Sequence, residues 1–181
     1  MLSAAAYVLM FLEFPVPLIP PFIKMDFSEL PALVASFAYG PVAGVAVCLV
    51  KNLIHLFNTQ SGGVGELANF ILGASFVFVA GMLYKRMHNK KGAVIGALVG
   101  AVIMAAISVP SNYFIVYPVY TAFMPMEAII GAYKAINPSV NTLLDCLLMF
   151  NMPFTFVKGL FSLVITFLIY KPLSPMLHGY K

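Results

Sequence analysis

The chain has 181 residues, of which 62% are apolar and only 9% charged, and its mean hydropathy is +0.98. Soluble domains are about 45–50% apolar and about 25% charged, so this composition excludes a soluble globular protein. Ten Lys and Arg residues stand against six Asp and Glu residues, a net charge of +4. The basic residues are spread along the chain rather than gathered in a stripe, which argues against a nucleic-acid partner.

The first apolar stretch, Leu2 to Phe14, is predicted to be a membrane helix. It lacks the positively charged start of a cleaved signal peptide, and prolines follow it where a small-residue cleavage site would be expected. At 1.5 Å per residue it is only about 20 Å long, which is short of the roughly 30 Å hydrocarbon core of a bilayer. We therefore expect the chain to begin inside its first helix.

Two more helices are predicted on either side of Gly40-Pro41, from Leu30 to Tyr39 and from Pro41 to Phe57. Proline has a fixed φ and no N–H to donate, so this pair ends one helix and begins another. A polar, glycine-rich loop is expected at residues 58–65. It is followed by a fourth helix, predicted from Glu66 to Tyr84.

The segment from Lys85 to Gly92 holds four of the ten basic residues and separates the fourth helix from a fifth, predicted from Ala93 to Tyr117. Lys and Arg concentrate in short cytoplasmic loops, so this loop is expected inside. Counting spans in both directions then predicts six transmembrane helices with both termini cytoplasmic. If residues 30–57 formed one kinked span, five helices would result and the N-terminus would lie outside.

Residues 118–152 are expected to form a long outer loop with short interfacial helices, because charged and amide residues are scattered through them. The sixth helix is then predicted from Pro153 to Tyr170, with the proline in the first turn, where its missing N–H costs little. Six spans of roughly 20 residues leave no room for a separate soluble domain. We expect residues 1–181 to form a single membrane-embedded, all-α domain.

Ionisable and amide side chains inside membrane spans are costly, so each one is a functional candidate. In the predicted topology they all fall in the outer half of the membrane. They are Lys51, Asn52, His55, Glu66, Asn69, Ser111, Asn112, Thr155 and Lys158. A transporter or receptor that faces outside needs such a polar cluster at its outer mouth, framed by apolar walls.

Structural roles compete with ligand binding for several of these residues. Lys51 and Glu66 flank the same short loop and are expected to neutralise each other. Asn69 and His55 suit hydrogen bonds between helices as well as they suit a ligand. Lys158 has no acidic neighbour at helical spacing, so either a ligand or a distant carboxylate must satisfy it.

Three further polar residues have specific expectations. The Asn112 amide offers donors and an acceptor of the kind that recognises an imide or a ring edge. Asp26 and Glu29, in the loop before the second helix, are expected to start that helix.

Nucleotide-binding, metal-binding and catalytic motifs are not visible in the sequence. Residues 62–65 lack the Gly-Lys-Ser/Thr ending of a phosphate-binding loop, and the histidines have no zinc-ligand spacing. Cys48 and Cys146 lie in apolar stretches and are expected to be packing residues. We therefore predict that the protein is not an enzyme and has no cofactor or resident metal. Uphill transport would need energy from another subunit.

Seven short runs, ordered along almost the whole chain, are informative together: Glu13-Phe14-Pro15, KMDFSELPAL at 24–33, GPVAG at 40–44, VKNL at 50–53, GELANF at 65–70, SNYF at 111–114 and PFTFVKG at 153–159. The strongest is DFSELPAL. The ordered set resembles the riboflavin-specific substrate-binding (S) components of the energy-coupling factor (ECF) vitamin transporters.

The resemblance implies a multi-pass subunit of a prokaryotic plasma membrane that captures riboflavin at the outer face, with FMN as a further candidate ligand. Its partners would be a transmembrane coupling subunit and two cytoplasmic ATPases. Some relatives carry Asn where this chain has Thr155. Position by position, the resemblance implies these substrate-binding residues: Asn112, Lys158, Thr155, Asn69 and Leu33.

The resemblance also implies a docking surface for the coupling subunit, since family members use two small alanines four residues apart on the first helix. Ala4 matches the second of them, and the first would precede Met1. Two alternatives remain open at this point. One is an S component for another vitamin, such as thiamine or a pantothenate-like acid whose carboxylate would pair with Lys158. The other is a small membrane enzyme or scaffold whose polar cluster is purely structural.

Overall fold

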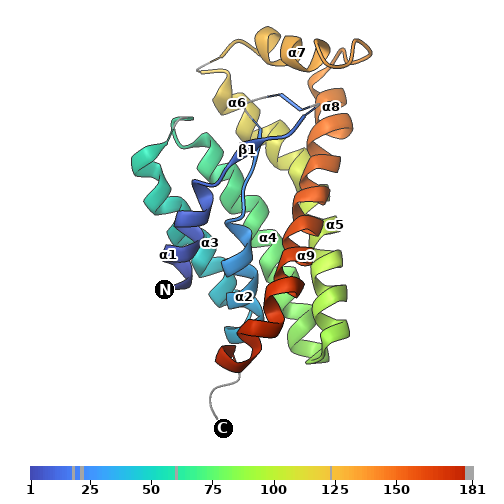
Figure 1. Ribbon diagram of the computed structural model, residues 1–181. Helices are drawn as coiled ribbons and strands as arrows, with labels where there is room; N and C mark the ends of the chain where they lie inside the picture. Colours follow the sequence, from blue (N-terminus) through green and yellow to red (C-terminus); the bar gives the residue numbers. More distant parts are fainter. Residues whose placement is uncertain (18, 21–22, 60, 123, 178–181) are drawn as a thin grey trace.

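The computed structural model describes residues 1–17, 19–20, 23–59, 61–122 and 124–177, and these form an almost entirely helical bundle (Figure 1). The helices are α1 (Leu2–Met10), α2 (Glu29–Tyr39), α3 (Pro41–His55), α4 (Val64–Met87), α5 (Lys90–Ser111), α6 (Tyr117–Tyr120), α7 (Met126–Lys134), α8 (Leu143–Cys146) and α9 (Met152–Leu177). Between them lie a 3-10 turn, η1 (Leu56–Asn58), and two π-helical turns, η2 (Asn112–Val116) and η3 (Leu147–Asn151).

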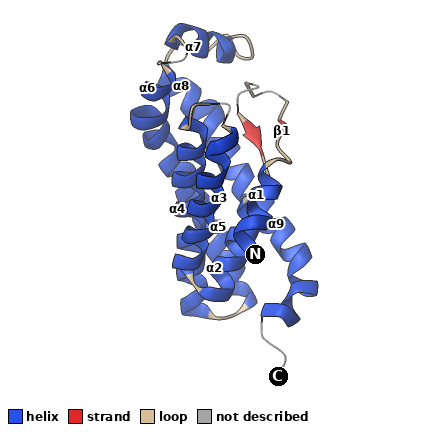
Figure 2. Cartoon of the chain, turned by 90° about the vertical axis from the view of Figure 1, so that its left-hand side faces the viewer, coloured by secondary structure: helices blue, strands red, loops and turns tan. Residues whose placement is uncertain are grey.

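Helix α7 lies across one end of the bundle, which we call the α7 end (Figures 1 and 2). The turn between α4 and α5 lies at the opposite end, and α9 runs toward that opposite end. A two-stranded antiparallel hairpin, β1 (Phe14–Pro15) and β2 (Lys24–Met25), connects α1 to α2 beside the α7 end.

Four segments are long and apolar enough to cross a membrane: Pro41–Asn58, Val64–Met87, Lys90–Tyr120 and Leu143–Leu168. The prediction of a helical membrane protein is therefore confirmed, although four described segments rather than six meet this criterion. The remaining two candidates are short. With 9 and 11 residues, α1 and α2 are only about 14 and 16 Å long.

The first helix is shorter than predicted. It ends at Met10 rather than Phe14, because the chain turns at Phe11 and then enters the hairpin, where Phe14 pairs with Met25. The prolines that follow cannot donate the main-chain hydrogen bonds that a helix needs. This stretch therefore forms an extended hairpin instead of continuing the helix.

The predicted basic loop at residues 85–92 is mostly helical. Helix α4 continues to Met87 and α5 begins at Lys90, so only His88 and Asn89 connect them. His88 ends α4 with a left-handed φ of 46°. The Asn89 side chain then caps α5 by accepting a hydrogen bond of 2.7 Å from the Gly92 N–H. Basic side chains thus extend from two helix ends rather than from a loop.

The last helical segment begins at Leu143, not at Pro153 as predicted. Thr142 and Asp145 form a capping box, with the Asp145 N–H donating to Thr142 Oγ1 at 3.2 Å and the Thr142 N–H donating to Asp145 Oδ2 at 2.9 Å. From there the helix continues through η3 into α9. The stretch expected to be a long outer loop therefore contributes its second part to the last membrane-crossing segment.

Each π turn stands two residues ahead of a proline. Turn η2 ends at Val116, before Pro118, and η3 ends at Asn151, before Pro153. Proline lacks the N–H of a regular helical hydrogen bond, and a wider turn lets the helix continue past it. The fifth predicted helix therefore continues past Tyr117 as one segment, Lys90–Tyr120, but with a π turn at Asn112–Val116.

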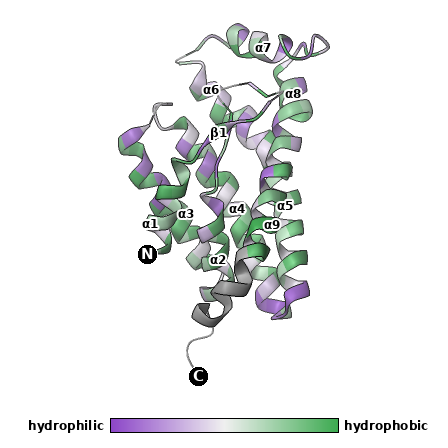
Figure 3. Ribbon diagram, viewed as in Figure 1, coloured by the Kyte–Doolittle hydropathy of each residue, from purple (hydrophilic) through white to green (hydrophobic). Residues whose placement is uncertain are grey.

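The main hydrophobic core joins α1, α2, α3, α4, α5 and α9, and it combines many alanines with a few larger side chains such as Phe76 and Met104. Helices α4 and α5 approach each other closely at Gly96, where an added Cβ would lie only 2.6 Å from the Ala80 carbonyl oxygen. Gly40, with a φ of 100°, provides the turn between α2 and α3. Figure 3 shows that the sides of the bundle are mainly apolar and that hydrophilic residues gather at its two ends.

Candidate functional site

A cavity of about 170 Å³ lies inside the bundle toward the α7 end, and we call it the main cavity. Its polar lining comes from Lys24, Glu29, Asn69, Asn112, Asn151, Thr155, Lys158 and the two tyrosines Tyr117 and Tyr120. Its apolar walls include Leu72, Met104, Val116, Ile129 and Phe154. Apolar walls with a few convergent polar groups are typical of a small-molecule site.

Two polar side chains in this lining have no partner within the described part of the chain. Asn112 is 6% exposed and Thr155 is 4% exposed, and neither side chain makes a hydrogen bond to the described residues. Buried polar groups in proteins are normally paired. The donors and acceptors of Asn112 and Thr155 are therefore free for a molecule inside the cavity.

The two π turns place the asparagines of the cavity. Asn112 is the first residue of η2 and Asn151 is the last residue of η3, and both line the main cavity. π turns are rare in proteins, but those that occur are often found at functional sites. Here each one aims an amide from a membrane-crossing segment into the same space.

Asn151 is engaged by two tyrosines in a closed ring of hydrogen bonds. Tyr133 donates to Asn151 Oδ1 at 2.6 Å, Asn151 Nδ2 donates to the Tyr117 hydroxyl at 3.2 Å, and the two hydroxyls lie 2.5 Å apart. Burial raises the pKa of Tyr133, so this hydroxyl keeps its proton and remains a donor. The ring ties α7 to the wall of the cavity.

A buried, charge-balanced network lies beside the cavity. Lys158 Nζ lies 2.8 Å from Asp26 Oδ2, and Lys51 Nζ lies 2.9 Å from Glu29 Oε1. Ser28 joins the two pairs, since its hydroxyl accepts from Lys51 at 2.6 Å and its N–H donates to Asp26 at 2.8 Å. Two carboxylates thus balance two ammonium groups.

The electrostatics of the network favour the ionised form of Asp26. Burial alone would raise the pKa of Asp26, but the Lys158 and Lys51 ammonium groups outweigh it and hold that pKa below its ordinary range. The Glu29 carboxylate fits because Gly73 of α4 faces it: an added Cβ at Gly73 would lie 2.5 Å from Glu29 Oε2. Glu29 is fully inside the protein, at 1% exposure.

These contacts correct one prediction and complete another. Lys51 does not pair with Glu66, because it lies one turn before His55 on α3 and faces Glu29 at the start of α2. Glu66 instead pairs with His55 at 2.7 Å and accepts from two hydroxyls of the 58–65 loop. Glu29 is the first residue of α2, as expected, but it also pairs with Lys51, whereas Asp26 lies before the helix and pairs with Lys158.

The structure brings together four of the five predicted substrate-binding residues. Asn69, Asn112, Thr155 and Lys158 all line the main cavity. Leu33 is fully buried in the hydrophobic core and is not part of this lining. The distant carboxylate that Lys158 was expected to need is Asp26.

Glu29, Asn151 and Tyr117 were not singled out from the sequence as site residues, although all three line the cavity. A signal for Asn151 exists, because it is an amide two residues before a proline in an apolar stretch. Ala4, the predicted docking residue, lies exposed on α1. No group of three or more His, Cys, Asp or Glu side chains that suits a metal ion occurs among the described residues.

An apolar helical bundle with a cavity at one end, beside a charge-balanced network of side chains, suits a membrane protein that holds a small molecule. The family model described as "ECF transporter, substrate-specific component" matches residues 1–170, and the chain belongs to this family. It is therefore an integral protein of the prokaryotic plasma membrane and a transporter subunit rather than an enzyme.

Individual relatives are similar over nearly their full length. The chain is 35% identical to riboflavin transporter RibU of Staphylococcus aureus (strain TCH60), with 98% of this chain and 88% of the relative covered. It is also 35% identical to riboflavin transporter FmnP of Bacillus subtilis (strain 168), with 97% and 89% covered. A solved S component of a bacterial ECF transporter matches with a TM-score of 0.77 and 34% identity, covering 98% of this chain and 93% of that one. The family resemblance predicted from the sequence is confirmed.

Proposed function

We propose that this protein captures riboflavin at the outer face of the membrane for ATP-driven uptake. The names of its relatives support this substrate. The main structural support is one observation in the cavity. Asn112 and Thr155 present unpaired hydrogen-bonding groups to a space with apolar walls. The flavin ring is flat and largely apolar, and its imide edge carries a donor between two carbonyl acceptors. An amide, which both donates and accepts, complements such an edge.

The charge balance beside the cavity favours an uncharged ligand. Asp26 already neutralises Lys158, so a ligand carboxylate of the pantothenate type would have to displace a partner that Lys158 already holds. A cationic ligand such as thiamine would add a positive charge, and the one carboxylate in the described lining of the main cavity, Glu29, is already paired with Lys51. Burying an unpaired charge is strongly unfavourable, so riboflavin is the better fit of the three.

The proposed roles follow from position. Asn112 and Thr155 would bond to the flavin ring, while Asn69 and Lys158 would contact the polar part of the ligand. Leu33 would act only through packing, because it is a residue of α2 that is fully buried in the hydrophobic core. These four polar residues come from α4, η2 and α9, so a bound ligand would hold separate helices together.

The proposed topology has six helices in the membrane and both termini in the cytoplasm, with residues 1–181 as one domain. Lys85, Arg86, Lys90 and Lys91 are exposed at the end opposite α7, and such residues mark the cytoplasmic side. This orientation puts the main cavity at the outer face. Helices α1 and α2 would lie within the membrane against α3 and, being short, would not reach across it alone.

The proposed partners are a transmembrane coupling subunit and two cytoplasmic ATPases. Ala4 on the exposed face of α1 would dock against the coupling subunit, because small residues let helix backbones approach closely in a membrane. ATP-driven coupling would supply the differential free energy that favours release of the ligand inside.

A fluorescence titration of the detergent-purified protein tests the substrate. We expect saturable quenching of flavin fluorescence that neither thiamine nor pantothenate reverses. Asn112→Ala should weaken binding about tenfold, the effect of losing one well-made hydrogen bond to a buried group. Ser111→Ala is the matched control, because the Ser111 hydroxyl is buried without a partner among the described residues and is not part of the cavity lining. Flavin fluorescence that stays constant at saturating protein would overturn the proposal.

A further inference from the structure

The ring of hydrogen bonds between Tyr117, Tyr133 and Asn151 joins two residues that reach the main cavity to one that does not. Tyr117 and Asn151 line the main cavity. Tyr133, on α7, is fully buried. It belongs neither to that lining nor to the lining of a second cavity, of about 520 Å³, beside the hairpin. Tyr133 therefore reaches a bound ligand through its two partners.

The three hydrogen bonds run in one direction around the ring. A tyrosine hydroxyl has one proton, and Tyr133 gives its proton to Asn151 Oδ1 at 2.6 Å. The bond of 2.5 Å between the two hydroxyls must then be donated by Tyr117, and Asn151 Nδ2 donates to Tyr117 at 3.2 Å. The two distances at the amide agree with this direction, because O–H donors form shorter hydrogen bonds than N–H donors.

This direction determines which groups the ring offers to the cavity. A half-turn of an asparagine amide exchanges its oxygen and nitrogen, and thus an acceptor for a donor. The Tyr133 hydroxyl binds the Asn151 oxygen and so favours one of the two orientations. Tyr117 uses one of the two Nδ2 protons, which leaves the other for a molecule in the cavity. Tyr117 itself has no proton left to donate.

A further donor in the main cavity suits the ring that is proposed to bind there. The imide edge of a flavin has two carbonyl acceptors and one donor, so it needs more donors than acceptors from the protein. The Asn112 amide can pair with the N–H and one carbonyl, which leaves the second carbonyl for another donor. Asn151 reaches the same cavity from a different membrane-crossing segment.

We propose that Tyr133 is a positioning residue for the ligand: its hydroxyl holds the Asn151 amide so that an Nδ2 proton is donated to a ring carbonyl of the bound flavin. This inference rests on the proposed flavin-binding function. It gives Tyr133 a part in ligand recognition beyond its part in holding α7 across the end of the bundle (Figure 1).

Infrared spectroscopy of bound riboflavin separates this role from a purely structural one. A carbonyl that accepts a hydrogen bond stretches at a lower frequency than a free one, and at saturation the band does not depend on affinity. Spectra with and without a heavy carbon isotope at the two flavin carbonyls isolate their bands from those of the protein. We expect Tyr133→Phe to move one carbonyl band to higher frequency. Asn151→Ala should move the same band in the same direction.

Affinity, measured by fluorescence quenching, gives a second test. Asn151→Ala should weaken riboflavin binding about tenfold, the effect of losing one hydrogen bond to a buried group. Tyr133→Phe should weaken it about threefold, because the amide remains but loses one of its hydrogen bonds. The double variant should bind as Asn151→Ala does, since Tyr133 acts through the amide. Tyr113→Phe is the matched control, because it removes a hydroxyl from an exposed position of η2 outside the cavity lining. It should change neither the band nor the affinity.

Three results would overturn the inference while leaving flavin binding intact. The first is a carbonyl band that stays in place in Tyr133→Phe, even if affinity falls, because Tyr133 would then act on stability alone. The second is a band that stays in place in Asn151→Ala, which tests the donor directly. The third is a double variant in which the two losses of affinity multiply. Failure of the natural sequence to bind riboflavin would instead overturn the proposed function.

Discussion

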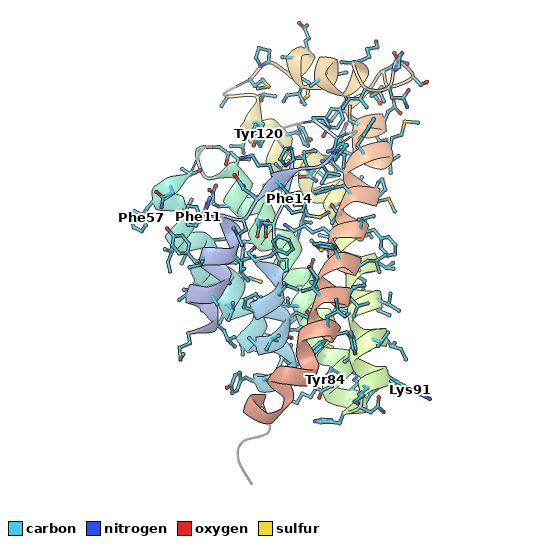
Figure 4. The ribbon with its side chains drawn as sticks, viewed as in Figure 1. Phe11, Phe14, Phe57, Tyr84, Lys91 and Tyr120 are labelled. Carbon is cyan, nitrogen blue, oxygen red and sulfur yellow. The ribbon has the colours of Figure 1, made fainter. Side chains whose placement is uncertain are left out.

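The helices associate through different kinds of contact at the two ends of the bundle. Toward the α7 end, the helices surround two cavities and are joined by ion pairs and amide hydrogen bonds. Toward the opposite end, α4 and α5 pack almost backbone to backbone through Gly96 and Ala80. Figure 4 places Tyr120 in the first region and Tyr84 and Lys91 in the second.

The difference follows from the surroundings of the helices. Lipid chains are as apolar as leucine side chains, so helices in a membrane associate through close packing or through polar contacts. Close packing fills space and leaves no room for a ligand, whereas polar contacts hold helices at a distance. The chain therefore concentrates its buried charges at the end where it keeps a cavity.

The strongest test of this comparison removes one partner from the fully buried pair Lys51 and Glu29. Glu29→Gln should cost about 3–5 kcal/mol of stability, because it leaves the Lys51 ammonium buried without its carboxylate. Thermal unfolding in detergent measures this. The double variant Glu29→Gln with Lys51→Met should recover much of the loss, since neither charge then remains buried. If Glu29→Gln alone has the same melting temperature as the unaltered protein, the polar network does not stabilise the α7 end of the bundle.

At the opposite end, Gly96→Ala should cost about 1–3 kcal/mol, the usual effect of overfilling a packed interior. The added Cβ would lie 2.6 Å from the Ala80 carbonyl oxygen, a backbone atom that cannot move alone. Gly131→Ala on α7 is the matched control, because a Cβ there would meet nothing within 4 Å. It should leave stability unchanged or raise it by up to about 1 kcal/mol. Comparable melting temperatures for the two variants would contradict close α4–α5 packing.

Tyr133→Phe examines whether α7 is held by the hydrogen-bonded ring with Asn151. We expect a loss of about 1 kcal/mol and faster amide hydrogen exchange confined to α7, because the Asn151 carbonyl loses its donor. Tyr113→Phe, on an exposed position of η2, should change neither quantity. Unaltered exchange in α7 would mean that apolar contacts alone keep it in place.

The smallest effect is expected at Thr166, near the end opposite α7. Its hydroxyl is buried without a partner in the described structure. Thr166→Val should therefore be neutral or raise stability by at most about 1 kcal/mol, because it removes an unsatisfied polar atom and keeps the shape. A clear drop in melting temperature would indicate that this hydroxyl has a partner in the membrane.

Local patterns in the sequence predicted the helical membrane class and the helix break at Gly40-Pro41, and both depend on composition or on spacing within a short stretch. The clustering of Asn69, Asn112, Thr155 and Lys158 was predicted from the topology and from the family resemblance, not from any one helix. The Lys158 partner depends instead on residue Asp26, 132 positions away, and no pattern within a single helix reveals it. The same limit explains why Lys51 was assigned to Glu66, its neighbour in sequence, rather than to Glu29.

Proline was the main source of error in the helix boundaries. Pro153 is a good first-turn residue, and it was interpreted as one, yet the chain had already become helical at the Thr142 capping box. Proline in a helix interior is normally disruptive because it cannot donate the regular hydrogen bond. Here the wider π turn before it lets the helix continue. The π turn is a feature of backbone geometry that the sequence pattern does not show. The pattern therefore predicted that a helix starts at Pro153.

The π turns also fix how the two halves of a helix are oriented about their common axis. Successive residues of an α-helix are rotated by about 100°, so an odd residue gained or lost between two halves turns one against the other by that angle. Gly96 of α5 faces α4 before η2, whereas Val116 at the end of η2 and Tyr117 just after it line the main cavity. Deleting a single residue from η2 after Asn112 would leave the packing seam in place and turn Val116 and Tyr117 away from the cavity, so one backbone irregularity sets the angle between the scaffold and this part of the ligand site.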